Sequence, residues 1–359
     1  MIKYLGSKRR LIARILEAVR AADPHARSVL DLFSGTSRVG HALKREGYRV
    51  LANDHNAYAA TLARCYVAAD RDDWLRDAER LVREFNALPG TPGWFTHTFC
   101  ERSRFFQPRN GARVDGIRDA IAAKALPPEL EAVMLVSLME AADRVDSTTG
   151  VQMAYLKRWA PRAERELELR VPELLPRAPR GKGEAHELDA ATAARTLVAD
   201  IAYLDPPYNQ HSYLGNYHVW ESLVRWDRPE VYGVACKRVD CRERRSAFNS
   251  KPRAAASLRA VLESLRARSV VLSFNDEGYV SRDELEAMLG ALWGGVAEVS
   301  VLEHDSKRYV GAQIGIHGPS GEKVGTVGRL RNKELLYVAT RREDASVPVE
   351  RSDDGAVVK

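Results

Sequence analysis

The sequence has few cysteines, and their spacing suggests neither a metal site nor a disulfide framework. Cys65, Cys100, Cys236 and Cys241 are scattered over 359 residues without a CxxC pair. This spacing argues against a zinc ribbon and against a disulfide-rich secreted fold. A reducing, cytoplasmic setting is therefore expected, with no bound metal.

Long hydrophobic runs are also missing. The strongest apolar stretch, residues 132–139, is bounded by Glu131 and Glu140, and it is far shorter than the ~20 residues that cross a bilayer. The basic N-terminal residues are not followed by a hydrophobic core, so no signal peptide is expected. Hydrophobic residues make up 45% of the chain, which is ordinary for a globular protein and argues against global disorder. We expect a globular chain without a membrane partner.

The chain has little excess charge, but that excess is concentrated. It carries 55 Lys and Arg against 49 Asp and Glu, a net charge of +6. Residues 1–14 hold five basic side chains and no acid, and residues 237–253 hold seven basic and two acidic ones. Local positive runs are what binding to a phosphate backbone needs. A solvated charged surface also explains either run taken alone.

The hydrophobic pattern predicts a doubly wound α/β sheet. Residues 28–33 (SVLDLF) read as a buried strand entering a tight turn, residues 39–45 as a helix and residues 49–52 as a second strand, which together make a βαβ unit. Ligands of such sheets bind at the carboxyl ends of the strands. Further strands are predicted at 185–188, 201–204, 269–274, 296–303, 308–316 and 334–340.

An insertion at 66–184 interrupts this pattern. Helices are predicted over 57–68, 74–85 and 129–145, with turn-rich loops at 89–93 and 107–111 and an irregular surface excursion at 158–184. Residues 209–255 form a second, basic excursion. A helix is predicted over 252–267, and a capping box at Ser281–Glu284 predicts the start of another. The polar residues 341–359 are expected to be a disordered tail.

Two motifs follow the first two strands. Asp31–Thr36 (DLFSGT) contains a glycine turn that lets a ligand approach the backbone, although it is neither a GxGxxG nor a Walker loop. Asp54 ends the second strand about 20 residues later, where an acid can bind the ribose hydroxyls of a nucleotide-like ligand. The alternative for Asp54 is a helix N-cap.

The most distinctive motif is Asp205-Pro206-Pro207-Tyr208, which follows the strand at 201–204. Two prolines fix the backbone and remove two donors, leaving a rigid corner that presents a carboxylate and a carbonyl. Two acceptors side by side suit an exocyclic amino group, and Tyr208 can stack on the ring that carries it. A structural proline turn with an N-cap aspartate is the alternative.

Taken in order, these motifs resemble a known family. Residues 3–8 (KYLGSK), DLFSGT, Asn53-Asp54 and DPPY are similar to the alpha group of D12-class DNA N6-adenine methyltransferases, which includes the Dam-type enzymes. The resemblance covers roughly 1–65 and 185–340, and Ser37 stands where many relatives have glycine. Four further stretches are similar to the modification methylases of restriction systems: 209–221, 273–278, 307–316 and 328–338.

The resemblance implies a Rossmann-like, class I S-adenosylmethionine-dependent catalytic domain at 1–65 and 185–340. Residues 66–184 would be a mostly helical target-recognition region, and residues 209–255 would contact DNA. The implied activity is site-specific methyl transfer to N6 of an adenine flipped out of double-stranded DNA. The implied catalytic residues are Asp205, Pro206, Pro207 and Tyr208. The implied cofactor-binding residues are Tyr4, Gly6, Ser7, Lys8, Asp31, Phe33, Ser34, Gly35, Asp54, Asp189 and Asp205.

For Asp189, a helix N-cap is again the alternative to binding the adenine of the cofactor. The implied partners are DNA and a restriction endonuclease that acts on the same site. Two other functions remain open: an RNA N6-adenine methyltransferase and a non-catalytic DNA-binding relative. The candidates for DNA contact are Arg102, Arg104, His211, Tyr213, Tyr217, Lys237, Arg238, Arg242, Arg244 and Arg245.

Overall fold

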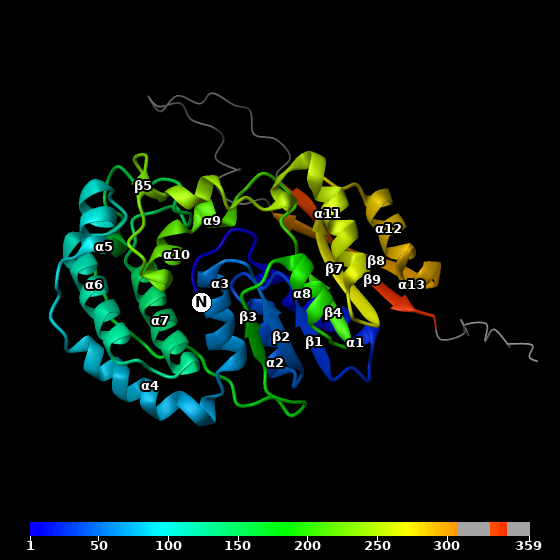
Figure 1. Ribbon diagram of the computed structural model, residues 1–359, viewed down its shortest axis with the longest axis horizontal. Coiled ribbons are helices and arrows are strands. Elements are labelled where there is room, and N and C mark those ends of the chain that lie inside the picture. The colour runs from blue at the N-terminus through cyan, green and yellow to red at the C-terminus, as the bar shows by residue number, and fades with distance from the viewer. Residues whose placement is uncertain (308–330, 343–359) are drawn as a thin grey trace, which may run out of the picture.

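A seven-stranded sheet forms one half of the molecule (Figure 1). The computed structural model describes residues 1–307 and 331–342. The strand expected at 308–316 lies outside these residues, as do positions 343–359 of the disordered tail expected over 341–359; Arg341, the first residue of that tail, belongs to a strand. The strand order is β3-β2-β1-β4-β7-β9-β8, and β9 runs antiparallel to both of its neighbours. The strands are β1 (Ser28–Asp31), β2 (Arg49–Asn53), β3 (Glu184–His186), β4 (Ile201–Leu204), β7 (Ser269–Asn275), β8 (Ala297–Lys307) and β9 (Arg331–Arg341).

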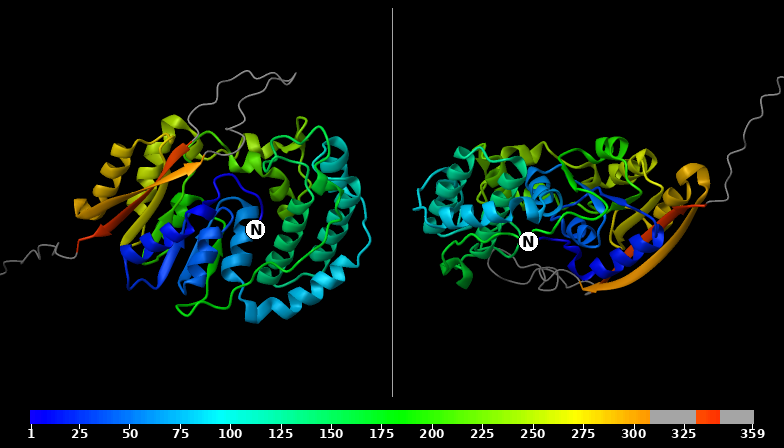
Figure 2. Two further views of the ribbon diagram at one scale, coloured as in Figure 1. Left: turned by 180° about the vertical axis from the view of Figure 1, so that it is seen from behind. Right: turned by 90° about the horizontal axis from the view of Figure 1, so that it is seen from below.

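Alternating side chains send apolar groups to both faces of the sheet, as expected for a doubly wound fold. Val29 and Val50 pack under α1 (Ile12–Ala22) and α2 (Arg38–Arg45), whereas Leu30 and Leu51 belong to the core of the opposite face. Helices therefore cover both faces of the sheet (Figure 2). This confirms the predicted fold class. The opposite face carries α8 (Ala190–Thr196), α11 (Lys251–Ser264), α12 (Arg282–Gly290) and α13 (Leu292–Gly295).

Local signals located several of these elements correctly. The predicted capping box is present, because the Ser281 hydroxyl accepts from the Glu284 backbone N–H and the Glu284 carboxylate accepts from the Ser281 N–H. The helix α1 was not predicted. Its buried Ile15 and Val19 lie one turn apart, a spacing that is typical of a helix with one apolar face.

A helical lobe beside the sheet accounts for most of the insertion (Figure 1). It begins where α3 (Ala57–Ala63) continues into the π-helical turn η2 (Arg64–Ala68) and includes α4 (Arg71–Asn86), α5 (Trp94–Thr96), η3 (His97–Arg102), α6 (Pro108–Ala123) and α7 (Pro128–Arg144). The loop predicted at 107–111 is wrong, because α6 starts at Pro108. Proline suits the first helical position, where its missing N–H is not needed. Gly111 packs against Cys100 where a larger residue would not fit.

Residues 158–184 are irregular, as predicted, apart from the short η4 (Pro161–Glu164) and Glu184, which begins β3, but they are not a surface excursion. Leu167, Leu169 and Leu174 are buried in the core of the helical lobe. Asparagine side chains satisfy the buried backbone there: Asn110 Oδ1 accepts from the Leu167 N–H at 3.0 Å, and Asn86 Oδ1 accepts from the Leu169 N–H at 2.8 Å. These hydrogen bonds replace those of a regular element.

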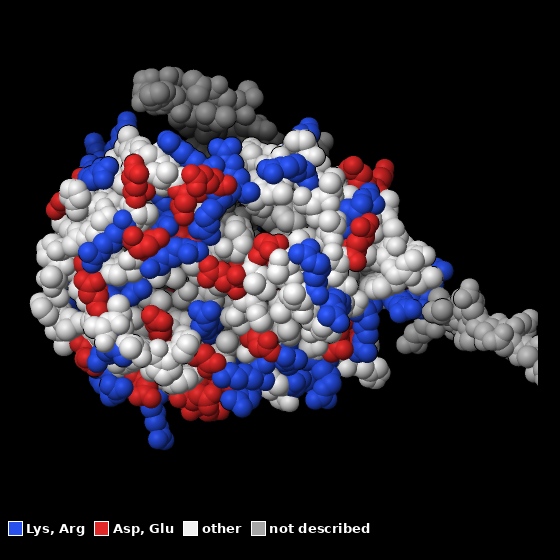
Figure 3. Space-filling view, in the orientation of Figure 1, with Lys and Arg blue, Asp and Glu red and all other residues white. Residues whose placement is uncertain are grey.

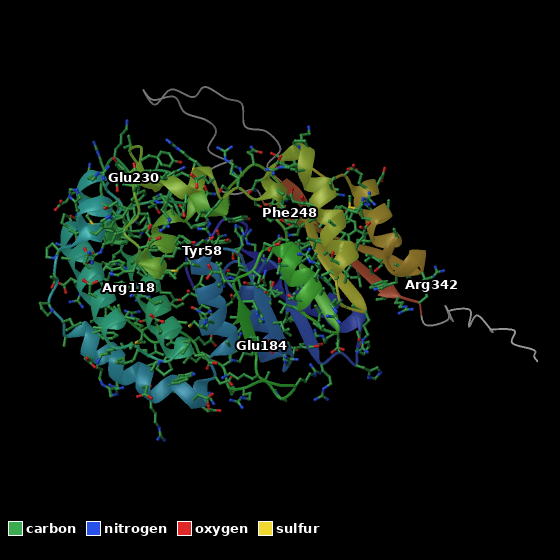
Figure 4. The ribbon with its side chains drawn as sticks, viewed as in Figure 1. Tyr58, Arg118, Glu184, Glu230, Phe248 and Arg342 are labelled. Carbon is green, nitrogen blue, oxygen red and sulfur yellow. The ribbon has the colours of Figure 1, made fainter. Side chains whose placement is uncertain are left out.

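The basic excursion at 209–255 also packs into the helical lobe. Trp220 and Leu223 of α10 (His218–Arg225) lie in its core. Arg118 of α6, labelled in Figure 4, donates to the Leu223 and Val224 carbonyls at 2.9 and 3.0 Å and so caps the end of α10. The other elements of this segment are α9 (Tyr213–Asn216), β5 (Val231–Tyr232), β6 (Lys237–Arg238), η5 (Val239–Arg242) and η6 (Ala247–Asn249).

Arg238 is buried, which corrects the expectation that it contacts DNA. Its two terminal nitrogens donate to the carboxylate of Asp227 at 2.7 Å each, and it also donates to Asp240 at 3.1 Å. These bonds raise the pKa of Arg238 above its ordinary value against the opposing effect of burial. A guanidinium held by two carboxylates in this way connects the segment to itself and is not available to a phosphate.

Among the described residues, no helix is both long and apolar enough to cross a membrane.

Arg238→Met should therefore destabilise the fold. Any loss of DNA binding in this variant would follow from that destabilisation and would not identify Arg238 as a DNA contact. We expect a loss of about 2 kcal/mol, less than the 3–5 kcal/mol of a fully buried pair, because Asp227 remains 40% exposed and can be hydrated. Denaturant unfolding followed by circular dichroism measures the change. Arg253→Met, at an exposed position on α11, is the control and should change stability by less than about 0.5 kcal/mol. Equal stability of the two variants would contradict the structural role of Arg238.

Candidate active site

A cavity lies at the carboxyl ends of β1, β2 and β4, where a doubly wound sheet binds its ligands. It is enclosed by residues from an N-terminal strap (residues 4–8) and from the segments that follow these three strands. Figure 4 labels Tyr58 on the side of the helical lobe and Phe248 on the side of the sheet. The expected cofactor residues that line the cavity are Tyr4, Gly6, Ser7, Lys8, Asp31, Phe33, Ser34, Gly35, Asp54 and Asp205.

Asp189 lies outside this cavity but lines a second one of about 590 Å³, which shares Phe33, His55 and Pro207 with the first. Asp189 Oδ1 accepts from the Thr192 backbone N–H at 3.0 Å, so it caps α8. The hydrogen bonding to Thr192 lowers the pKa of Asp189. Capping a helix and lining the second cavity are thus compatible roles for this residue.

The centre of the site is an ammonium shared by two carboxylates. Lys8 Nζ lies 3.0 Å from Asp205 Oδ1 and 3.3 Å from Glu334 Oε2. The side chains of Lys8, Asp205 and Glu334 are 6%, 20% and 12% exposed. Sequence reasoning assigned Lys8 to the cofactor pocket and did not identify Glu334. The structure adds that Lys8 contacts the first residue of the DPPY motif directly.

Burial and charge oppose one another in this cluster. Burial lowers the pKa of Lys8, but the Asp205 and Glu334 carboxylates outweigh it and raise that pKa well above its ordinary value. Burial raises the pKa of Asp205 to about 6; Lys8 opposes this shift and Glu334 adds to it. Near neutral pH, Lys8 is therefore charged and Asp205 is a carboxylate that can accept hydrogen bonds.

Asp31 is the second buried carboxylate of the cavity. Its Oδ2 accepts from the Gly40 N–H at 3.0 Å, and its buried Oδ1 has no hydrogen-bond partner among the described residues. Burial, reinforced by the charge of Asp205, raises the pKa of Asp31 to about 8. A buried acceptor without a partner is costly, and here it lines a cavity able to hold a ligand that donates to it.

The glycine turn is held by Asp54. Its Oδ2 accepts from the Gly35 N–H at 3.1 Å and its Oδ1 from the Asn56 N–H at 3.0 Å. Gly35 and Ser37 both have left-handed backbones, with φ of 50° and 57°. Ser37 therefore adopts the left-handed conformation that a glycine would favour at this position.

A column of tyrosines connects the strap to the helical lobe. The ring of Tyr4 stacks on Tyr213 and on Tyr217, with centroids 5.2 and 4.6 Å apart. The Leu5 N–H donates to the Tyr217 hydroxyl at 2.5 Å. Tyr217 is buried, so it supports the strap and is not exposed to a base, which corrects its prediction as a DNA contact. Tyr213 lines the cavity.

The DPPY motif forms the corner after β4. Pro206 is buried, whereas Pro207 and Tyr208 are partly exposed. The Tyr208 ring meets Phe274 edge-on at 6.1 Å, and its carbonyl accepts from the Tyr279 N–H at 3.0 Å. Burial raises the pKa of Tyr208 to about 12. The motif is thus fixed on the β7 side, with Asp205 facing the cavity.

The basic DNA candidates divide into engaged and exposed side chains. Arg244 donates to the buried Glu221 at 2.9 Å, and the Arg104 guanidinium lies 4.7 Å from the Trp159 ring centroid. Lys237 contacts the sulfur of Met153 at 3.0 Å. Figure 3 shows basic and acidic side chains interleaved over this lobe, so this face does not present one sign of charge. The candidates that are exposed are Arg102, His211, Arg242 and Arg245.

Further residues of the site were missed, among them Phe248 and Arg38. Phe248 lines the second cavity and meets Phe33 edge-on at 5.2 Å. Arg38, at the start of α2, lines the first cavity, and its buried Nε has no hydrogen-bond partner among the described residues. Arg38 could have been suspected because it directly follows the glycine turn. Phe248 had no local signal, since it approaches the cavity from the basic excursion.

Comparison with known proteins agrees with this geometry. The model of the D12 class N6 adenine-specific DNA methyltransferases matches residues 4–288. The type II methyltransferase M.FokI of Planomicrobium okeanokoites is 29% identical over 306 residues, covering 80% of this chain and 46% of the relative. The modification methylase StsI of Streptococcus sanguinis is 26% identical over 303 residues, covering 80% of this chain and 46% of the relative.

This chain thus spans about half the length of those two relatives. The type II methyltransferase M.NlaIII of Neisseria lactamica is covered more fully: it is 29% identical over 292 residues, which make up 78% of this chain and 85% of the relative. The family match extends over most of the chain, including the glycine turn, Asp205 and the helical lobe. The chain belongs to the D12 class of N6 adenine-specific DNA methyltransferases.

Proposed function

We propose that this protein transfers a methyl group from S-adenosylmethionine to N6 of an adenine flipped out of double-stranded DNA. The observation that carries the proposal is Asp205: a carboxylate on the rigid DPPY corner, at the edge of a cavity that also contains Asp31, whose Oδ1 has no hydrogen-bond partner among the described residues. The modification-methylase relatives support a site-specific reaction and a restriction endonuclease of the same specificity as partner.

The cavity suits the proposed cofactor. Its methionine end carries an ammonium and a carboxylate beside a sulfonium, and its other end is a nucleoside. Asp31 Oδ1, which has no hydrogen-bond partner in the described part of the chain, can accept from the ammonium, and the Arg38 guanidinium can pair with the carboxylate. Asp54 follows β2, where an acid takes ribose hydroxyls. The second cavity, with Phe33 and Phe248, offers apolar rings and the capping carboxylate of Asp189 to the adenine.

The cofactor supplies an electrophilic methyl group, whose carbon–sulfur bond breaks with its electron pair left on sulfur. The protein must make the adenine amino nitrogen nucleophilic, because its lone pair is delocalised into the ring. Asp205 and the Pro206 carbonyl accept its two hydrogens, which favours a pyramidal nitrogen, and the proton lost on methylation leaves through Asp205. Positioning and electrostatics of this kind contribute several kcal/mol.

The target base has to leave the duplex, since a paired amino group is not accessible; unstacking costs a few kcal/mol. Tyr208, partly exposed beside Asp205, is the ring on which we expect the flipped adenine to stack. Arg102 and Arg245 are exposed and available to phosphates, whereas the exposed Arg242 also lies over the Tyr232 ring, 3.9 Å from its centroid. We assign sequence recognition to the helical lobe together with residues 209–255.

The direct test is methyl transfer. The purified protein is incubated with isotopically labelled S-adenosylmethionine and either duplex DNA from a host that lacks adenine methylation or total RNA, and digested nucleosides are separated. Label in N6-methyladenine from DNA is the expected result. Label in RNA alone, or cofactor binding without transfer to either substrate, would overturn the proposal.

Asp205→Asn should abolish most transfer while the protein still binds DNA. Losing a positioned proton acceptor costs about 10²- to 10⁴-fold in rate. In the wild type, the rate should fall as the pH drops through about 6, the value to which burial raises the pKa of Asp205, because the protonated carboxyl no longer accepts. Asp283→Asn, in the first turn of α12, is the control and should keep wild-type turnover. Wild-type turnover by Asp205→Asn would contradict the mechanism.

Asp31 should make cofactor affinity depend on pH. Burial raises the pKa of Asp31 to about 8, and only its carboxylate form attracts an ammonium. Affinity for S-adenosylhomocysteine should therefore rise with pH up to about 8, by as much as about tenfold per unit. Calorimetric titrations of the wild type and of Asp31→Asn with the same ligand isolate this carboxylate, because the ligand titrates equally in both. Parallel pH dependences would show that Asp31 does not bind the ammonium.

A further inference from the structure

Glu334 enters the active site from a strand that supplies none of the expected motifs. It lies at the start of β9, opposite Asn275 at the end of β7. Its Oε1 accepts from Asn275 Nδ2 at 3.3 Å, and its Oε2 lies 3.3 Å from Lys8 Nζ. Asn275 thus orients one oxygen of Glu334, and the other faces the ammonium that also contacts Asp205.

A second carboxylate here is not needed to neutralise Lys8. Asp205 alone would form a neutral pair with the ammonium, so adding Glu334 leaves a net negative charge in a largely buried cluster. Burying an extra charge is unfavourable unless its interactions compensate for the lost hydration. This cost suggests that Glu334 has a role in the site, which is to change the electrostatic effect of the Lys8 ammonium on Asp205.

The arrangement of Lys8 between Asp205 and Glu334 shows how this effect arises. An ammonium has three N–H donors, and Lys8 directs them toward carboxylates on both sides. With Glu334 present, the positive field of Lys8 at Asp205 is partly cancelled. Without it, Lys8 would bind Asp205 alone, and the Asp205 oxygens would be weaker acceptors for any other donor.

We propose that Glu334 is a positioning residue that holds Lys8 between two carboxylates and so keeps Asp205 available to accept a hydrogen bond from the amino group of the target base. This inference rests on the proposed function, since it requires Asp205 to face that amino group. Glu334 acts through Lys8 and is not itself a catalytic residue.

Among the groups around Asp205, Glu334 is the acid that shares the Lys8 ammonium with it. Asp31 is the other acid that acts on Asp205, and it binds Gly40 instead. The remaining ionisable neighbours are tyrosines, which are neutral near pH 7 at their ordinary pKa, and burial raises their pKa values further. The charged or titratable groups that act on Asp205 are Lys8, Asp31, Tyr203, Tyr208, Tyr213 and Glu334.

The first measurement needs neither cofactor nor DNA. The full chain is labelled with ¹³C-carboxyl aspartate, and the Asp205 resonance is assigned by its loss in Asp205→Asn. Removing a neighbouring negative charge favours the carboxylate form, so Glu334→Gln should lower the pKa of Asp205 relative to the wild type. Glu303→Gln is the matched control: Glu303 lies on the adjacent β8 and pairs with Arg282 and Lys333, so the pKa of Asp205 should not move.

The second measurement is kinetic. In Glu334→Gln, turnover should fall by about tenfold or more, and the acid limb of the pH–rate profile should move to lower pH. The dissociation constant for S-adenosylhomocysteine should change by no more than about twofold, because Glu334 acts on Asp205 and not on the cofactor. Glu303→Gln should keep wild-type turnover and the wild-type acid limb. A purely structural role would not move the acid limb.

An unchanged pKa of Asp205 in folded Glu334→Gln would overturn the inference, as would loss of cofactor affinity in parallel with turnover. If the glutamine variant does not fold, Glu334→Asp withdraws the carboxylate from Lys8 by one methylene. It should then shift the acid limb in the same direction by less, and an unmoved limb would overturn the inference. Failure of the wild type to methylate would instead contradict the proposed function, and the pKa measurement would still report on the Glu334–Lys8–Asp205 arrangement.

Discussion

The shared ammonium of Lys8 is the constraint on which the site depends. Lys8, Asp205 and Glu334 are far apart in the sequence, and they meet only when the strap, the end of β4 and the start of β9 are in place. An unpaired charge at this depth would cost several kcal/mol. The site therefore forms together with the sheet. The reversed direction of β9 explains why Glu334 belongs to the site. A parallel strand would bring its end to this edge, whereas the antiparallel β9 brings its first residues.

The second organising feature is the acidic character of the cavity. Asp31, Asp54 and Asp205 line it together with the basic side chains Lys8 and Arg38, and Glu334 lies behind Lys8. Such a wall favours a cationic ligand, and Asp31 Oδ1, which has no hydrogen-bond partner within residues 1–307 and 331–342, offers one specific point of attachment. The tyrosine column ties this cavity to the helical lobe, because Tyr4 lies in the cavity wall and also stacks on Tyr213 and Tyr217. The wall of the cavity and the placement of the lobe thus share one element, the strap.

Much of the fold could be predicted because its signals are local. The turn after β1, the two prolines after β4 and the capping box at Ser281 each depend on a few neighbouring residues. The failures share a different cause. The start of α6 was read as a loop because Pro108 and Gly111 usually break structure, but one occupies the first helical turn and the other permits close packing against Cys100. Residues 158–184 looked like surface because nothing local shows that asparagines from other helices satisfy their backbone.

The sequence by itself determined the sheet, the motifs that line the cavity and the family resemblance, because strand periodicity and turn chemistry depend on a few neighbouring residues. Only the tertiary structure decided which charges are partners. Arg238 and Arg245 look alike in the sequence, yet Arg238 is buried against Asp227 and Asp240, whereas Arg245 is exposed at the second cavity. Glu334 looks like any polar residue at the start of a strand until Lys8 is placed beside it. The physical reason is that the effect of a charge depends on its distance from other charges and on its hydration, and both are properties of the folded chain.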